Sequence, residues 1–65
     1  MMKHLHLYTV LYDTCSPIAV NLNFVRTISP NNINSNHTDI YFGKDDMITV
    51  CESYEEVYQM FNSLT

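Results

Sequence analysis

Basic side chains are scarce in this chain of 65 residues, which has three of them, Lys3, Arg26 and Lys44, against seven acidic ones. The formal net charge is −4. Proteins that bind a phosphate backbone normally cluster lysine and arginine, so nucleic-acid binding is disfavoured. No apolar run approaches the roughly 20 residues that span a bilayer, and the first residues lack the apolar region of a secretory signal. These absences predict a cytoplasmic protein without a membrane segment, unless a leader has been removed.

Glycine and cysteine are rare as well. The chain has one glycine, Gly43, two cysteines, Cys15 and Cys51, and no tryptophan. We assign the special backbone conformation of a turn to Gly43. The cysteines are too far apart for a CxxC redox motif and too few for a disulfide framework. For a cytoplasmic chain we expect two reduced thiols, and a single disulfide if the protein is secreted. A chain this short buries only about 60% of its unfolded surface, so its one domain (1–65) packs efficiently or gains burial by forming a homo-oligomer.

The clearest local signal lies near the C-terminus, where a strand pattern gives way to a helix. Ser53 and Glu56 form the Ser-x-x-Glu capping box, in which the serine oxygen accepts from the Glu56 N–H and the carboxylate reaches back to the Ser53 N–H. Beyond the cap, apolar residues recur at i, i+3, i+4 and i+7, the stripe of an amphipathic helix. They are Val57, Met60, Phe61 and Leu64. We predict a helix over 54–64 whose apolar face needs a sheet to lie on.

Four or five strands are predicted before this helix. Residues 5–12 alternate as in a strand, and the Asp-Thr-Cys-Ser-Pro run at 13–17 reads as a turn before a second strand over 18–23. A change of apolar parity near Val25 predicts a bulge or short helical turn, after which 24–28 continues the strand or begins another. The asparagine-rich segment 29–37 reads as a loop, in which Ile33 either pins the loop down or is exposed.

Two further strands, 38–42 and 47–51, are expected to form an antiparallel hairpin. We therefore predict an α+β fold: a small antiparallel β-sheet or partly open barrel of four or five strands, connected as a meander and capped by one C-terminal helix. The predicted core is Leu5, Leu7, Leu11, Ile18, Val20, Leu22, Ile28, Ile40, Phe42, Ile48, Val50, Val57, Met60, Phe61 and Leu64.

No group of residues predicts a catalytic, cofactor or metal site. His4 and His6 share a strand face and could bind a metal with His37 as a third ligand, but no nearby carboxylate completes such a site, and surface histidines are favoured. The acidic pair Asp45 and Asp46 lies in the predicted hairpin turn. The pair Glu55 and Glu56 lies at the start of the predicted helix, where negative charge is stabilising. We predict a protein that is not an enzyme.

The tyrosines are the most informative polar set. Tyr8 and Tyr12 share the strand face opposite the leucines, and Tyr41 lies opposite Ile40 and Phe42. If the helix covers the apolar face, Tyr8, Tyr12 and Tyr41 line the other side of the sheet as a candidate interaction face, because tyrosine is enriched at interfaces. Aromatic side chains on an open sheet can also stack with bases.

Three segments carry a family resemblance. They are 18–28, then Asp-Ile-Tyr-Phe at 39–42, and finally Ile-Thr-Val-Cys-Glu-Ser at 48–53 followed by Glu-Glu-Val. Together they resemble the small FlbD-type proteins of flagellar operons, and the strand–turn–strand–Ser-x-x-Glu–helix order also resembles the C-terminal part of LytTR-type DNA-binding domains. The chain departs from both in lacking a glycine in its first turn, and it lacks the basic residues of a LytTR domain. The composition, rich in asparagine, isoleucine and tyrosine, is typical of an AT-rich bacterial or phage genome.

Three functional hypotheses follow. The first is a non-enzymatic protein-interaction or structural module that acts through a sheet edge or the tyrosine face, with a protein partner or a second copy of itself. The second is a nucleic-acid-binding regulatory domain. The third, a metal protein or small enzyme, depends only on the histidines and cysteines.

Overall fold

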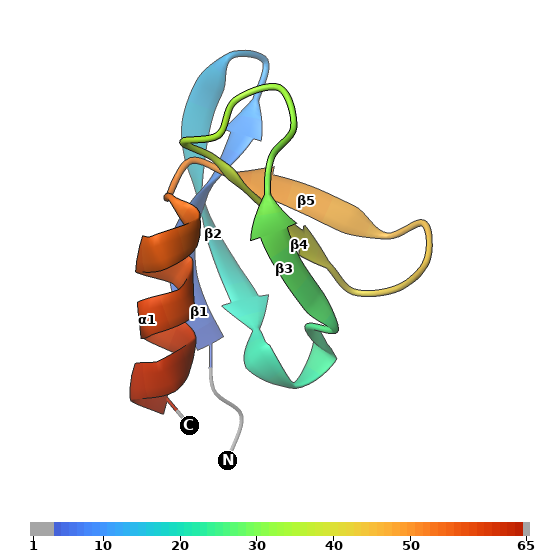
Figure 1. Cartoon of the computed structure of the whole chain (residues 1–65), viewed down its shortest axis with the longest axis vertical. Helices are drawn as coiled ribbons and strands as arrows, with labels where there is room; N and C mark the ends of the chain where they lie inside the picture. The colour runs from blue at the N-terminus through green and yellow to red at the C-terminus, as the bar shows by residue number, and fades with distance from the viewer. Residues whose placement is uncertain (1–3, 65) are drawn as a thin grey trace.

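The fold is a five-stranded antiparallel open sheet with one C-terminal helix, seen in a computed structural model that describes residues 4–64 (Figure 1). The predicted α+β class is therefore confirmed. The elements are β1 (His4–Leu11), β2 (Thr14–Asn21), the 3-10 helix η1 (Leu22–Phe24), β3 (Thr27–Pro30), β4 (Thr38–Tyr41), β5 (Met47–Val50) and α1 (Tyr54–Leu64).

The strand order is β2-β1-β5-β4-β3, so the predicted meander is wrong. A β1–β2 hairpin and a β3–β4–β5 meander are joined by antiparallel pairing of β1 with β5, where Thr9 faces Val50. This order places β1 inside the sheet, which brings its buried leucines to the centre of the molecule. Short-range patterns carry no information on such a pairing between sequence-distant strands.

The β1–β2 hairpin turns on two residues, Tyr12 and Asp13, with φ angles of 49° and 63°. Positive φ at both central residues is the requirement of a type I′ turn, whose twist matches that of the flanking strands. The predicted turn over 13–17 is therefore wrong, since β2 already begins at Thr14. Gly43 has no positive φ, so the special conformation assigned to it is wrong too.

Both outer strands carry a proline whose nitrogen faces away from the sheet. In β2, Pro17 is opposite Tyr8, whose own N–H and C=O point toward the β5 side. In an antiparallel pair, the backbone groups of two opposed residues either both point toward each other's strand or both point away from it. Those of Tyr8 point away from β2, so the Pro17 nitrogen points away from β1, to the free edge of the sheet. After β3, the Asn31 N–H donates to the His37 carbonyl, on the β4 side. Backbone groups alternate in direction along a strand, so the nitrogen of Pro30, one residue earlier, points away from β4. Each free edge thus lacks one donor, a device that discourages edge-to-edge pairing.

The parity change near Val25 is confirmed as the short helical turn η1. The Asn21 side chain accepts the Asn23 N–H at 2.9 Å and ends β2. Val25 then packs against the core, whereas Phe24 is 66% exposed.

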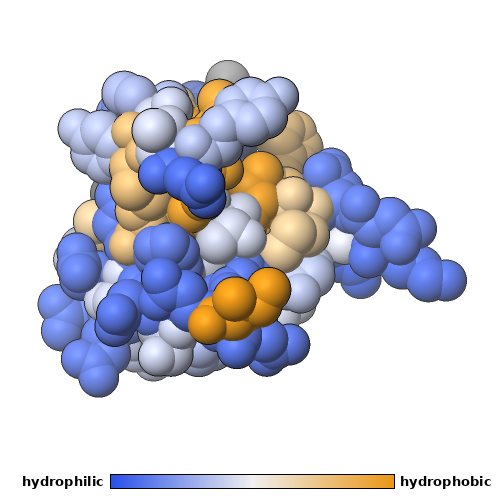
Figure 2. Space-filling view, turned by 90° about the horizontal axis from the view of Figure 1, so that it is seen from above, coloured by the Kyte–Doolittle hydropathy of each residue, from blue (hydrophilic) through white to orange (hydrophobic). Residues whose placement is uncertain are grey.

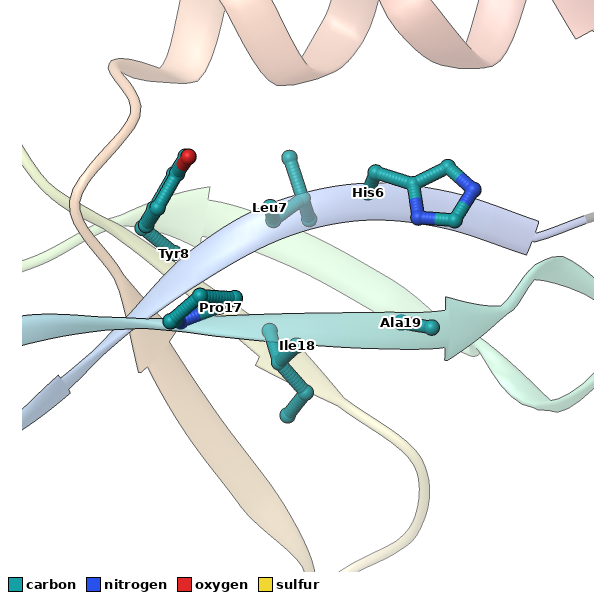
Figure 3. Close-up of a pocket in the computed structure, with 6 residues that line it drawn as sticks. All are labelled: His6, Leu7, Tyr8, Pro17, Ile18 and Ala19. Carbon is teal, nitrogen blue, oxygen red and sulfur yellow. The ribbon is translucent and has the colours of Figure 1, made fainter.

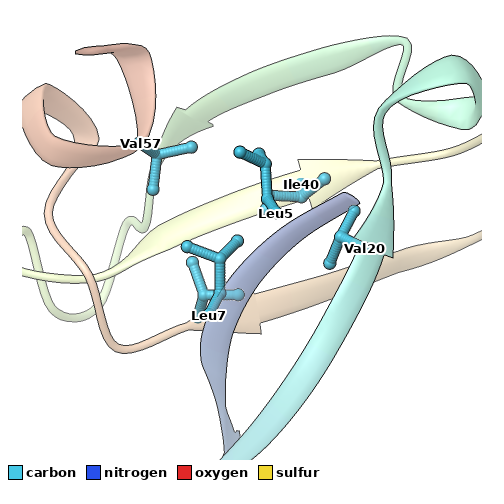
Figure 4. Close-up of a cluster of buried hydrophobic side chains, with 6 residues drawn as sticks. Leu5, Leu7, Val20, Ile40 and Val57 are labelled. Carbon is cyan, nitrogen blue, oxygen red and sulfur yellow. The ribbon is translucent and has the colours of Figure 1, made fainter. Parts of the chain in front are cut away.

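The core is one cluster between the sheet and α1 (Figure 4). Its buried members are Leu5, Leu7, Val20, Ile40, Val50 and Val57. Seven other predicted core residues pack around them partly buried: Ile18, Leu22, Ile28, Phe42, Ile48, Met60 and Phe61. Leu11 was wrongly placed in the core; it is 49% exposed at the end of β1 next to the hairpin turn, and the bridge between β1 and β5 is at Thr9 and Val50. The side chain of Leu64 lies outside the described residues.

The helix α1 begins and ends where the sequence predicts. The Ser53 oxygen accepts the Glu56 N–H at 3.3 Å, as expected of a capping box, and the Glu56 carboxylate accepts the Ser53 hydroxyl. Val57 is fully buried in the core, and Met60 and Phe61 pack against it partly buried. Within residues 4–64, no helix combines the length and apolar character needed to cross a membrane.

Cys15 and Cys51 form a disulfide, so the expectation of two reduced thiols is wrong. Cys15 lies in β2 and Cys51 directly follows β5, on opposite sides of β1 in the strand order. The sequence separation of 36 residues concealed this proximity, which arises only once β5 pairs with β1.

Candidate functional site

The side chains of His4, His6 and Tyr8 form a row along β1 that the fold leaves exposed. Cross-strand pairing places His6 beside Ala19 and Tyr8 beside Pro17 on β2. Because these β2 side chains are small, the surface is hollowed into an open depression of about 410 Å³, and Figure 3 shows it with α1 running alongside β1. We call this exposed row the β1 row.

A second hollow lies between β1 and α1 and is bordered by the same histidines. It is an open groove of about 460 Å³, which we call the β1–α1 groove. The β1 side contributes His4, Leu5 and His6, and the helix contributes Glu56, Gln59, Met60 and Ser63. These helix positions are spaced i, i+3, i+4 and i+7, so they form one stripe along the helix. Met60 provides apolar surface, Leu5 is 3% exposed at the floor, and the other side chains are polar.

The backbone of β1 is paired on both sides over only part of its length. The Cys51 N–H donates to the Tyr8 carbonyl at 2.7 Å, and the Tyr8 N–H donates to the Glu52 carboxylate at 3.1 Å. The chain then leaves the sheet to begin α1. Because backbone groups alternate in direction along a strand, those of His4 and His6 point to the same side as Tyr8, beyond the end of β5. The N-terminal half of β1 is therefore an open strand edge that faces the β1–α1 groove.

The three tyrosines of the predicted interaction face occupy three separate parts of the surface. Tyr8, 50% exposed, belongs to the β1 row. Tyr41 lines a depression of about 400 Å³ together with Arg26 and Lys44. Tyr12 is 92% exposed at the tip of the hairpin.

Tyr12 combines exposure with an unfavourable backbone conformation. A positive φ costs a residue with a large side chain more than it costs glycine or asparagine, so Tyr12 is a poor choice for turn formation alone. The type I′ turn imposes this conformation on the position, so Tyr12 stays a candidate interaction residue on its exposure alone.

The asparagine-rich loop between β3 and β4 lies at the same end of the molecule as the hairpin turn (Figure 1). Its asparagines organise it: the Asn31 side chain accepts the N–H groups of Ile33 and Asn34, and the Asn34 side chain accepts that of Asn36. Ile33 is 97% exposed, so it does not pin the loop down. An open groove of about 590 Å³ separates the loop from the hairpin, and Figure 2 shows apolar surface among the hydrophilic residues of this end.

A buried polar cluster connects the asparagine-rich loop to the sheet. Asp39 is 8% exposed, and its carboxylate accepts hydrogen bonds from the Asn31 amide and the Thr49 hydroxyl, both at 2.8 Å. Every buried polar side-chain atom in residues 4–64 has a partner. The cluster is therefore a satisfied structural network that fixes the loop to the sheet.

The histidines are not brought together as a trio. His4 and His6 border the β1–α1 groove, whereas His37 lines the groove at the loop end. Among the described residues, no three histidine, cysteine or carboxylate side chains cluster at metal-binding distance.

Sequence patterns alone did not reveal the β1–α1 groove. The exposed row was visible in the alternation of β1, but the open edge depends on where β5 leaves β1. That point is set by the Glu52 carboxylate, a contact across 44 residues.

The sequence matches no family model, no curated protein and no solved structure. The resemblance to FlbD-type proteins and to LytTR-type domains therefore stays a prediction.

Proposed function

We propose that this chain is a non-enzymatic protein-interaction module that binds its partner through the β1 row and the open edge beside it. The single observation that carries the proposal is the half-paired state of β1: among the described residues, 4–64, no strand pairs with one edge of its N-terminal half. Exposed strand edges are templates for pairing with another chain, and folded proteins normally block them. This chain blocks its two outer edges with Pro17 and Pro30 and leaves the inner one accessible.

The surroundings of this edge suit protein recognition. Tyr8 offers a rigid aromatic surface with a polar tip, a combination enriched at protein interfaces. His4, His6 and the exposed end of α1 supply polar contacts around it. The net charge of −4 disfavours close approach of two copies, so a distinct partner chain is favoured over self-association.

Site-specific photo-crosslinking in extract of the cells that make the protein tests the proposal. A photoreactive phenylalanine analogue replaces Tyr8 in one variant and Tyr58 in a control, since both tyrosines are 50% exposed. We expect Tyr8, and not Tyr58, to trap a defined protein with or without nuclease. Equal trapping from both positions, or none from either, would contradict binding through the β1 row.

The alternative function, a nucleic-acid-binding regulator, has one observation in its favour. Tyr41 shares its depression with Arg26 and Lys44, the basic side chains of residues 4–64. A ring for base stacking next to two cations is a minimal single-strand binding element. Fluorescence anisotropy with oligothymidine and oligouridine at low salt tests it, with the double variant Arg26→Ala/Lys44→Ala as the control. Failure of both oligonucleotides to bind at low ionic strength would exclude this function.

The cytoplasmic location predicted from the sequence has one observation against it. Disulfides persist in oxidising compartments and are rare in the cytosol, so the bond between Cys15 and Cys51 favours an oxidising location. Alkylation of thiols in rapidly acidified cells distinguishes the two. Two alkylated cysteines in the native protein would support the cytoplasm, and none would support an oxidising compartment.

A further inference from the structure

We propose that the β1–α1 groove binds an extended peptide segment that adds as a strand to the open half of β1 and carries apolar residues together with a lysine or arginine. This inference rests on the proposed function and names the binding mode and the chemistry of the partner. In strand addition, main-chain hydrogen bonds supply affinity and side-chain pockets supply specificity. The groove has features for both.

The main-chain part is provided by His4 and His6. Their N–H and C=O groups point to the same side as those of Tyr8, whose carbonyl already accepts the Cys51 N–H at 2.7 Å. An incoming strand on this side would continue the ladder that β5 begins. The space beside His4 and His6, beyond the end of β5 and alongside α1, thus has the position of a missing strand segment.

The side-chain part is provided by the floor and the helix wall. Met60, partly buried, offers apolar surface to an extended segment, and the buried Leu5 lies at the floor beneath it. The helix stripe covers about two turns, roughly 10 Å, which matches three or four residues of a strand. The groove therefore fits a short segment, not a whole domain.

The charge of the groove selects the partner. Glu56, exposed in the first turn of α1, is the carboxylate that lines the groove. Arg26 and Lys44, the described basic side chains, lie in a different depression. A cationic segment is therefore attracted, and a second copy of this acidic chain would bring Glu56 side chains together.

Selection from a library of short random peptides displayed on phage provides the first test. The bait proteins are the parent, Gln59→Lys and Asp45→Asn. Gln59 is an exposed groove residue, and Asp45, in the β4–β5 turn, gives the same change in net charge away from the groove. We expect the parent and Asp45→Asn to enrich alternating apolar peptides with lysine or arginine, and Gln59→Lys to enrich none of them. No enrichment by the parent over Gln59→Lys would overturn the proposal.

The second test uses the most enriched peptide and a copy methylated on its central backbone amides. We expect methylation to weaken binding about tenfold or more, as measured by titration calorimetry, because it removes ladder hydrogen bonds. In hydrogen-exchange NMR the bound peptide should protect the His6 amide and leave the Ala19 amide unchanged. Ala19 is the matched control, since it pairs with His6 and its amide faces the blocked outer edge of β2.

Other outcomes separate this inference from the proposed function. Protection of Ala19 in place of His6, or equal affinity of the methylated peptide, would overturn strand addition at β1. A concentration-dependent dimer in sedimentation analysis that Gln59→Lys abolishes would show that a second copy fills the groove, and would overturn the peptide proposal. If a partner is still trapped from Tyr8 in either case, the interaction module stands while the binding mode fails.

Discussion

Cys15 and Cys51 are bonded across a strand that separates them, with their Cα atoms 6.3 Å apart. Cys15 is opposite Val10 on β1, and Cys51 donates its N–H to Tyr8 on the other side of the same strand. The bond therefore clamps β1 between its neighbours at the point where β5 ends and the chain turns toward α1. It ties the connection between β5 and α1 to β2.

The double variant Cys15→Ser/Cys51→Ser is expected to lose about 3–4 kcal/mol of unfolding free energy, because the bond closes a loop of 36 residues in the unfolded chain. That is most of what a domain of this size has available. Urea unfolding followed by tyrosine fluorescence measures the loss. Added reductant should destabilise the parent to the same extent and leave the double variant, which has no cysteine, unchanged; a parent that is equally stable with and without reductant would contradict the assignment.

Asp13→Gly is expected to stabilise the protein by up to about 1 kcal/mol, because glycine adopts a φ of 63° without steric cost. Tyr12→Asn should add a similar gain and at the same time remove the exposed ring. Thermal unfolding monitored by circular dichroism measures both. Gly43→Ala is the control: Gly43 has no positive φ and a new Cβ would meet only the Asp46 Cβ at 3.9 Å, so it should be neutral or slightly stabilising.

Asn31→Ala is expected to lower stability by about 1–3 kcal/mol, because it removes a hydrogen bond to the buried Asp39 carboxylate and two that organise the loop. Hydrogen exchange should increase at Ile33 and Asn34, because their backbone N–H groups donate hydrogen bonds to the Asn31 side chain. Asn36→Ala, in the same loop, serves as the comparison and should change little. Unchanged exchange at Asn34 in Asn31→Ala would show that the loop does not depend on this side chain.

Val57→Ala is expected to cost about 2 kcal/mol, because it removes two methyl groups from the fully buried contact between α1 and the sheet. Phe61 is only partly buried, so Phe61→Ala should cost less than the 3–5 kcal/mol of a fully buried aromatic. Chemical unfolding of both variants gives the ranking. A Val57→Ala protein that unfolds like the parent would contradict the packing of the helix on the sheet.

Local patterns predicted the elements of this fold well. The 3.6-residue stripe and the capping box placed α1, and the parity change near Val25 located η1, because both features arise from neighbouring residues. The run ending in Pro17 was misread as a turn because its composition suits one. An edge strand tolerates a proline whose nitrogen faces outward, and composition does not report which strands lie at the edge.

Long-range relationships could not be read from the sequence. Pairing of β1 with β5 determines the strand order, the disulfide and the open edge, and all three depend on contacts across about 40 residues. Leu11 shows the same limit at one residue: it alternates with Leu5 and Leu7, but the bridge between β1 and β5 is at Thr9 and Val50, and Leu11 is 49% exposed. The exposed tyrosines were predicted as one surface because the twist and ends of the strands are not encoded in alternation.

The internal position of β1 also constrains how the chain folds as it is synthesised. The β1–β2 hairpin can form as soon as the first third of the chain has left the ribosome, but Leu5 and Leu7 stay uncovered until β5 and α1 follow. Such late, sequence-distant contacts slow folding and leave apolar surface open to aggregation in the meantime. The apolar core therefore closes only after β5 and α1 have been made, although the domain is small.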